Sequence, residues 1–193
     1  RVLGPLNPQG IRVTSFKKPT EEEIARGYLW RIQQKVPRKG MIRVFNRSHY
    51  EDVLVVRVRD LAPAEEVEKR YQQINDFEKY LTENRVVVLK FMLHISKKEQ
   101  KERLLRRLHK KDKHWKFNTA DLKERRKWPS YMEAFQIALS RCSTEDTPWY
   151  VIPANRRWAR DVIIAKIIKD HLKALDLQYP PAEEGLDKVV IDD

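Results

Sequence analysis

Short apolar runs alternate with helical patterns along most of this chain, and this alternation constrains its fold more than any other feature. The runs at residues 12–16, 41–45, 86–93 and 149–152 have the length and composition of strands. Between them, apolar residues recur at every third or fourth position, as they do on one face of a helix. Strands that alternate with helices are typical of a parallel sheet with helices on both faces. The sequence therefore predicts an α/β fold.

Helix signals divide the segments between these strands. A capping box at residues 20–23 opens a helix that ends before Pro37, and Pro63 suits the first turn of the next helix. A second capping box, at residues 96–99, opens a third helical segment. Asn155 can cap a last helix that runs to about residue 175. Pro129 interrupts the pattern of the third segment, and residues 53–58 fit either a strand or a helix.

A polar tripeptide follows the second strand. Asn46, Arg47 and Ser48 stand at its carboxyl end, which is the end where α/β sheets bind their ligands. In P-loop enzymes a strand in this place delivers a magnesium-holding side chain beside the phosphates. The same pattern also fits a core strand followed by a polar loop without a function.

Positive charge is concentrated in one segment. The chain has 40 Lys and Arg against 28 Asp and Glu, a net charge of +12, which favours an anionic partner. Nucleic acid, nucleotides, inorganic phosphate chains and membrane surfaces all satisfy that condition. Residues 96–127 alone hold 14 Lys and Arg against five Asp and Glu. Such a segment is either a solvated charged helix or a lid over an anionic substrate.

The single cysteine and the chain length bear on the cellular compartment and the number of domains. Cys142 has no second cysteine to pair with, which fits a reducing cytoplasm, and its place on an apolar helix face indicates a core residue. No apolar run approaches the roughly 18 residues of a membrane helix. The 193 residues predict one domain over 1–180, followed by an acidic tail over 181–193 that we expect to be mobile.

Five runs together resemble the polyphosphate kinase 2 family, in the family's own order and over nearly everything from residue 1 to about 180. They are NPQG (7–10), GMIRVFNRSHYEDVLVVRV (40–58), VVVLKFMLHISKKEQ (86–100), KHWKFNTADLKER (113–125) and STEDTPWYVIPANRRWARD (143–161). The resemblance implies a P-loop kinase-like three-layer sandwich with a parallel central sheet, similar to thymidylate kinase, and a helical lid at about 96–130. It also implies phosphoryl transfer between inorganic polyphosphate and nucleoside mono- or diphosphates with Mg²⁺, in the cytoplasm, by a homo-oligomer (dimer or tetramer).

The resemblance extends to the polar tripeptide. Asn46, Arg47 and Ser48 match the family's Walker-B-like motif, in which many members carry Asp at the position of Asn46. Asn followed by Tyr50 and Glu51 resembles the branch that phosphorylates both mono- and diphosphates. Asn46 and Glu51 are then the implied metal ligands, and Ser48 an implied nucleotide or polyphosphate contact. Arg47 is the implied catalytic group that contacts transferring phosphates, although a surface ion pair with a neighbouring acid fits as well.

Further roles follow from the same resemblance. Arg107 falls at the position of the family's catalytic lid arginine. The remaining implied nucleotide- or polyphosphate-binding residues are Lys17, Arg31, Lys113 and Lys116.

One family motif is missing. The Walker A motif, of the form GxDxxGKD, should precede the NPQG run, but residues 1–6 contain no GK pair. We therefore expect these 193 residues alone to be inactive. Two alternatives remain open: a family member without catalysis, and a basic nucleic-acid- or polyanion-binding module. The high pI of about 9.8 supports that module. Nucleic acid is the weaker reading, because the charge lies in one lid-like segment and the polar tripeptide would have no role.

Overall fold

The computed structural model describes residues 2–184 and 189 and shows an α/β fold with parallel strands. Strand β1 (Ile11–Ser15) pairs in parallel with β2 (Ile42–Asn46), and β3 (Lys90–His94) pairs in parallel with β4 (Trp149–Pro153). Within the described residues these are two separate two-stranded sheets. The predicted α/β class is confirmed, whereas the predicted acidic tail lies largely outside the described residues.

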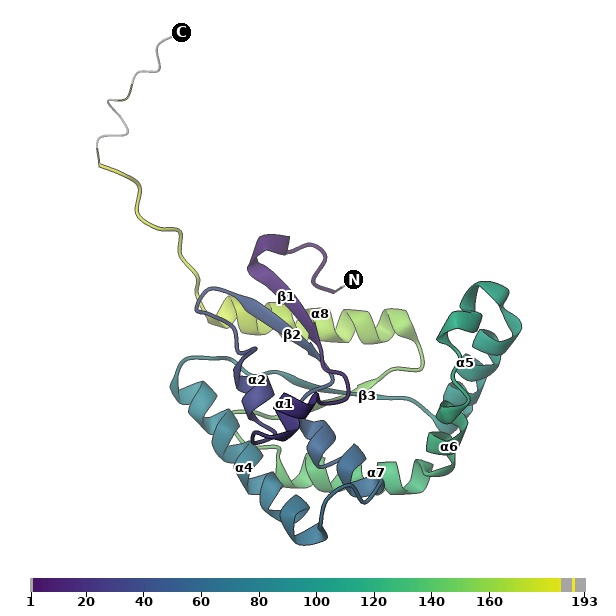
Figure 1. Ribbon diagram of the computed structural model, residues 1–193. Coiled ribbons are helices and arrows are strands. Elements are labelled where there is room, and N and C mark those ends of the chain that lie inside the picture. Colours follow the sequence, from purple (N-terminus) through teal and green to yellow (C-terminus); the bar gives the residue numbers. More distant parts are fainter. Residues whose placement is uncertain (1, 185–188, 190–193) are drawn as a thin grey trace.

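Helices lie on both sides of the strands. In Figure 1, α8 runs above β3, α4 and α7 lie below it, and α5 with α6 stands to one side. No described helix has both the length and the apolar character needed to cross a membrane. The helices are α1 (Glu21–Ile24), α2 (Trp30–Gln33), α3 (Val55–Val58), α4 (Ala64–Glu83), α5 (Lys97–His109), α6 (Ala120–Arg126), α7 (Trp128–Arg141) and α8 (Arg157–Ala174), with short 3-10 helices η1 (Pro8–Gly10), η2 (His49–Asp52) and η3 (Lys111–Lys116).

The prediction of one helix from residue 20 to Pro37 was wrong. The capping box between Thr20 and Glu23 is present, but α1 ends at Ile24 and α2 begins at Trp30. Gly27 lies between them, and glycine in a helix interior is destabilising by roughly 1 kcal/mol relative to alanine. The break lets the chain fold back, so that Arg31 donates to the Glu23 carboxylate at 3.1 Å. In a continuous helix, residues eight positions apart would be separated by about 12 Å.

Two further expectations are corrected. The strand expected at 86–93 is paired only from Lys90 onward, because the partner of residue 89 would be Pro148, which has no N–H to donate. Asn155 does not cap α8. Its Oδ1 accepts a hydrogen bond from the Ser96 N–H at 3.0 Å, which ties the end of β4 to the start of α5. The sequence did not decide between strand and helix for residues 53–58, and in the structure Val55–Val58 form the helix α3.

The core lies where η2, α4 and α7 meet. Its buried members come from residues 50–54, from the inner face of α4, and from α7 with the residue that follows it. They are Tyr50, Val53, Leu54, Val67, Tyr71, Ile74, Ala134, Ala138 and Cys142. The interpretation of Cys142 as a core residue is confirmed.

We expect the thiol of Cys142 to be unreactive in the folded protein. It is fully buried, and burial raises its pKa to about 11, so that little thiolate exists at neutral pH. A chromogenic thiol reagent should leave the native protein almost unlabelled and should label one thiol per chain in guanidinium. Labelling of the native protein at the rate of a free thiol would contradict this placement.

Candidate functional site

The polar tripeptide forms a sharp turn at the carboxyl end of β2. Asn46 is the exposed last residue of the strand, and its Nδ2 donates to Ser15 Oγ of β1 at 3.5 Å. Arg47 has a φ of 63°, in the left-handed region that non-glycine residues rarely adopt. Ser48 caps η2, because its Oγ accepts from the Tyr50 N–H at 3.3 Å. A turn of this kind at the end of a parallel strand is typical of a functional loop.

Three arginines, here called the arginine cluster, lie near enough to Glu51 for their charges to act on its carboxyl. Burial raises the pKa of its half-buried carboxyl, and the charges of Arg47, Arg59 and Arg31 oppose that rise, in this order of strength. The charge of Arg47 acts on Glu51, but within the described residues Arg47 forms no ion pair with it, so its guanidinium is available to an anion. The site therefore combines one carboxylate with several positive groups, which suits a phosphate ester and its counter-ion.

Arg59 is a member of this cluster that the sequence did not reveal. It follows α3, where the sequence pattern fitted a strand as well as a helix, so its direction could not be predicted. Its guanidinium lies 2.8 Å from the Glu124 carboxylate of α6. Arg59 thus connects the arginine cluster with the basic helical segment.

Arg31, a member of the arginine cluster, is held firmly in place. It donates to the Lys17 carbonyl at 2.8 Å, and its guanidinium lies 5.0 Å from the centre of the Phe16 ring. Lys17 itself is exposed, directly after β1. The structure therefore brings the predicted site residues of the core together at the carboxyl ends of β1 and β2: Lys17, Arg31, Asn46, Arg47, Ser48 and Glu51.

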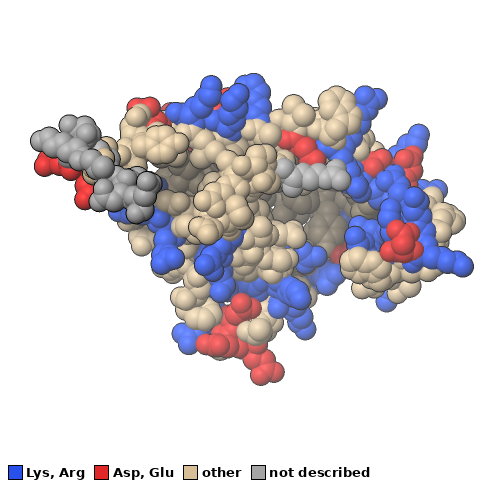
Figure 2. Space-filling model, turned by 90° about the horizontal axis from the view of Figure 1, so that it is seen from above, with Lys and Arg blue, Asp and Glu red and all other residues tan. Residues whose placement is uncertain are grey.

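The other three predicted residues lie on the separate helical segment. Arg107 of α5 is 40% exposed at its side chain and faces Asp121 of α6 at 3.6 Å. Lys113 and Lys116 belong to η3, and Lys116 lies over the exposed Trp115 ring at 4.5 Å. Figure 2 shows Lys and Arg side chains gathered at this end of the molecule. In this conformation the segment does not cover the residues at the ends of β1 and β2 (Figure 1).

The basic segment is attached to the core at both of its ends. Near its start, Arg103 of α5 donates to the Ala154 carbonyl after β4 at 2.7 Å. Near its end, Lys127 donates to the Val58 carbonyl at 3.1 Å, close to the pair between Arg59 and Glu124. The helices between these attachments contact each other, for example where Arg125 donates to the Lys97 carbonyl at 2.8 Å.

The donors at the turn fit part of a magnesium shell. Among the described residues, no group of three or more His, Cys, Asp or Glu side chains is placed to hold a metal ion. Asn46 and Glu51 offer an amide oxygen and a carboxylate, and Mg²⁺ in nucleotide enzymes takes one or two carboxylates with phosphates and waters. The residues present are therefore compatible with Mg²⁺ that is held mainly by a phosphate substrate.

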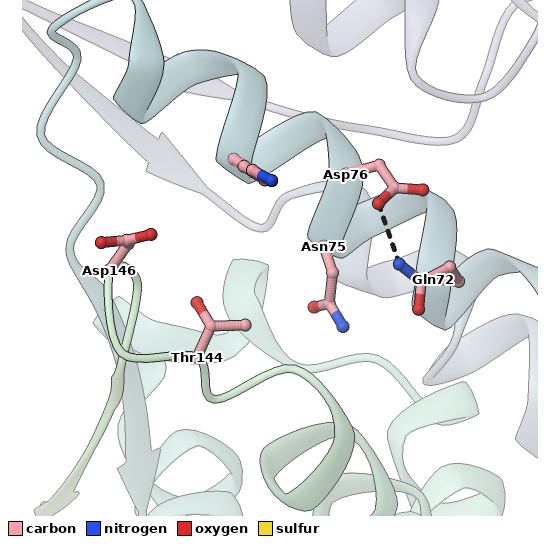
Figure 3. A pocket seen from close by; sticks show the side chains of 6 residues that line it. Gln72, Asn75, Asp76, Thr144 and Asp146 are labelled. Atoms are coloured by element: carbon pink, nitrogen blue, oxygen red, sulfur yellow. Dashed lines mark hydrogen bonds between the residues drawn. The ribbon is translucent and has the colours of Figure 1, made fainter.

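A hollow of about 300 Å³ lies elsewhere, between α4 and the loop before β4 (Figure 3). Its lining is polar, and Gln72 donates to Asp76 across one side at 2.8 Å. None of the predicted site residues lines it. The hollow therefore adds nothing to the site at β1 and β2.

Comparisons with known proteins identify the family. The profile described as Polyphosphate kinase 2 matches residues 1–180. An AMP/ADP-polyphosphate phosphotransferase of Meiothermus ruber is 51% identical over 191 residues, which are 99% of this chain and 72% of that protein. An ADP-polyphosphate phosphotransferase of Rhodopseudomonas palustris is 41% identical, over 93% of this chain and 66% of its own length.

Solved structures agree with this result. The crystal structure of Polyphosphate Kinase 2 from Arthrobacter aurescens TC1 superposes with a TM-score of 0.94 at 46% identity. The match covers 96% of this chain and 66% of that one, so the present sequence corresponds to about two thirds of the solved protein. The chain belongs to the polyphosphate kinase 2 family.

Proposed function

We propose that this chain forms most of a polyphosphate:nucleotide phosphotransferase, which moves phosphoryl groups between inorganic polyphosphate and nucleoside mono- or diphosphates. The observation that carries this proposal is the cluster of Arg31, Arg47 and Arg59 around Glu51 at the carboxyl ends of β1 and β2. The names of the relatives, which act on AMP, ADP and polyphosphate, support the same substrates. The decisive experiment incubates the complete enzyme with polyphosphate, Mg²⁺ and AMP or ADP and follows the nucleotide products.

The proposed architecture is a P-loop kinase-like three-layer sandwich similar to thymidylate kinase. Within the described residues, β2 and β3 each have a partner on one side only, so each leaves one edge for a further strand. A strand that carries the Walker A loop would join the two sheets into one parallel sheet. The helices α4 and α7 would then form one outer layer and α8 the other (Figure 1).

The proposed chemistry consists of alignment and charge cancellation. Phosphoryl transfer requires little covalent work from the protein. Arg47 would bind phosphate oxygens through its planar fork, while Ser48, Lys17 and Arg31 hold the nucleotide or the polyphosphate chain. When bound, Mg²⁺ would neutralise phosphate oxygens beside Asn46 and Glu51.

The basic segment is proposed to be a lid at about residues 96–130. Arg107 would reach the transferred phosphate when the segment closes, and Lys113 and Lys116 would bind the polyphosphate chain. We further propose a reducing, cytoplasmic setting and a homo-oligomer, a dimer or tetramer.

A polyanion-binding module without catalysis is the second candidate. The observation in its favour is Trp115, which is 78% exposed beside Lys116 and is therefore available for stacking on a base. This candidate predicts retention on DNA or RNA with a steep dependence on salt and no nucleotide turnover by the complete protein.

Glu51→Gln is expected to lower phosphorylation of AMP more than phosphorylation of ADP. Asn46 contributes no negative charge, so Glu51 has to supply part of the charge that Mg²⁺ and the acceptor phosphate require. The measurement is kcat/KM for each acceptor in the complete enzyme. Glu83→Gln, at an exposed position on α4, is the matched control and should change neither value. Equal loss on both acceptors would contradict this role of Glu51.

A further inference from the structure

A buried polar cluster includes the two residues that directly follow the turn of the candidate site. Its centre is Glu78 of α4, whose side chain is fully buried. The Glu78 carboxylate lies 2.5 Å from Lys90 Nζ and accepts from the Tyr50 hydroxyl at 3.0 Å. It also accepts from Thr147 Oγ1 at 2.9 Å and lies 3.2 Å from His49 Nε2. All five residues are buried.

The cluster joins four parts of the chain that are distant in sequence. His49 and Tyr50 belong to η2, Glu78 to α4, and Lys90 is the first residue of β3. Thr147 precedes β4. The Lys90 ammonium completes the connection, because it also donates to the Tyr50 hydroxyl at 3.0 Å and to the carbonyl of Cys142, at the end of α7, at 2.6 Å. Movement of η2 relative to these elements would therefore break several hydrogen bonds together.

Stability alone does not explain this arrangement. Desolvation of two buried charges offsets most of their attraction, and apolar replacements of similar volume are often as stable or more stable. Burial by itself would raise the pKa of Glu78, but the hydrogen bond from His49 and the charge of Lys90 outweigh it and leave the pKa lowered. Glu78 is thus ionised at neutral pH. A fixed charge with several directional partners defines geometry in a way that apolar packing does not.

The cluster fixes the position of the chain segment that carries the candidate site. His49 and Tyr50 directly follow Ser48, and Asn46, the last residue of β2, directly precedes the left-handed turn at Arg47. Glu51, the next residue after Tyr50, emerges among the arginines. The anchored residues His49 and Tyr50 therefore lie between the two proposed metal ligands, Asn46 and Glu51, in sequence, so the cluster restricts the movement of the segment that carries both.

We propose that Tyr50, Glu78 and Lys90 are positioning residues, which hold the turn at 46–48 and Glu51 in the geometry that phosphoryl transfer requires. This inference rests on the proposed function, because it assigns these residues a role in that reaction. None of the three needs to contact the substrate.

The test removes one oxygen atom from the cluster. Tyr50→Phe in the complete enzyme keeps the ring but loses the hydroxyl that bridges Lys90 and Glu78. We expect kcat to fall about tenfold, since small displacements of positioned groups have effects of up to about 100-fold. The KM values for polyphosphate and nucleotide should stay within about twofold, because the binding groups remain. Tyr71→Phe is the control, since its hydroxyl is also buried but forms no hydrogen bond with the residues of the cluster.

If the wild-type enzyme turns over, the proposed function holds, and two outcomes would then overturn the inference about the positioning residues. One is an unchanged kcat in Tyr50→Phe. The other is a loss of kcat and of melting temperature that is equal in Tyr50→Phe and Tyr71→Phe. Absence of turnover in the wild type would instead overturn the proposed function, and the inference with it.

A second set of variants distinguishes the role of the cluster in positioning the site from its contribution to the stability of the fold. Glu78→Gln and Lys90→Met each leave one buried group without its charged partner, so each should lower the melting temperature. The double variant removes both charges and should recover much of that loss. Its kcat should remain low, because the ammonium that donates to the Tyr50 hydroxyl and to the Cys142 carbonyl is absent, and the amide at position 78 has one acceptor oxygen in place of two. A double variant with the wild-type kcat would overturn the proposal.

Discussion

Arg107→Ala is expected to lower kcat of the complete enzyme by about 10³-fold or more, as the loss of an arginine finger does. In the structure Arg107 is partly exposed on α5, and its ion pair with Asp121 spans 3.6 Å. An exposed pair of this kind contributes little free energy, so a phosphate chain can displace Asp121 without a large penalty. In the proposed closed lid, the guanidinium is therefore available to the transferred phosphate.

Two companion variants make this result specific. Arg107→Lys should restore little activity, because the ammonium lacks the planar fork that binds two phosphate oxygens. Arg106→Ala removes an equal charge from the preceding position of the same helix and should retain most of kcat. Initial rates over a range of polyphosphate concentrations give kcat and KM separately for each variant. A raised KM with an unchanged kcat in Arg107→Ala would mean that Arg107 only binds the chain.

Residues 1–193, produced alone, are expected to bind polyanions but to transfer no phosphate. The expected Walker A segment supplies the backbone N–H groups that cradle phosphate and the lysine that reaches the bridging oxygens. It also supplies the strand that we place between β2 and β3, so without it the free energy of unfolding should be smaller. The 14 Lys and Arg of residues 96–127 remain, so salt-sensitive binding of polyphosphate should persist.

The measurement compares this fragment with the complete enzyme. Both are incubated with polyphosphate, Mg²⁺ and AMP or ADP, and nucleotide products are followed over time. Binding is measured on immobilised polyphosphate at increasing salt, and unfolding by denaturant titration. Turnover by the fragment near that of the complete enzyme would show that the Walker A segment is dispensable or that its placement is wrong.

The sequence predicted the type of most elements because their signals are local. Apolar runs identified the four strands, and Pro129 marked the boundary between α6 and α7. The misplaced boundaries depend on contacts that are not local. Pro148 ends the pairing of β3 from the neighbouring strand, and the division of α1 from α2 involves both Gly27 and the fold-back of Arg31.

The site was predictable only in part, for a related reason. The position of residues 46–48 after an apolar run indicated a ligand-binding turn without any structure. Arg59 was not identified, because residues 53–58 fitted two kinds of element. Glu78 was missed as well, since a single carboxylate on the buried face of a helix carries no signal of its partner twelve residues later in β3.

The hydrogen bond from Lys90 to residue 142 has a consequence for how sequences of this kind can diverge. Lys90 contacts the main-chain carbonyl of Cys142, and every amino acid presents the same carbonyl. Natural variation can therefore exchange the thiol for another small side chain without disturbing the ammonium. It cannot as easily lengthen, shorten or tilt the end of α7, since the carbonyl would move away. Selection should thus act on the path of the backbone at this position more than on the identity of its side chain.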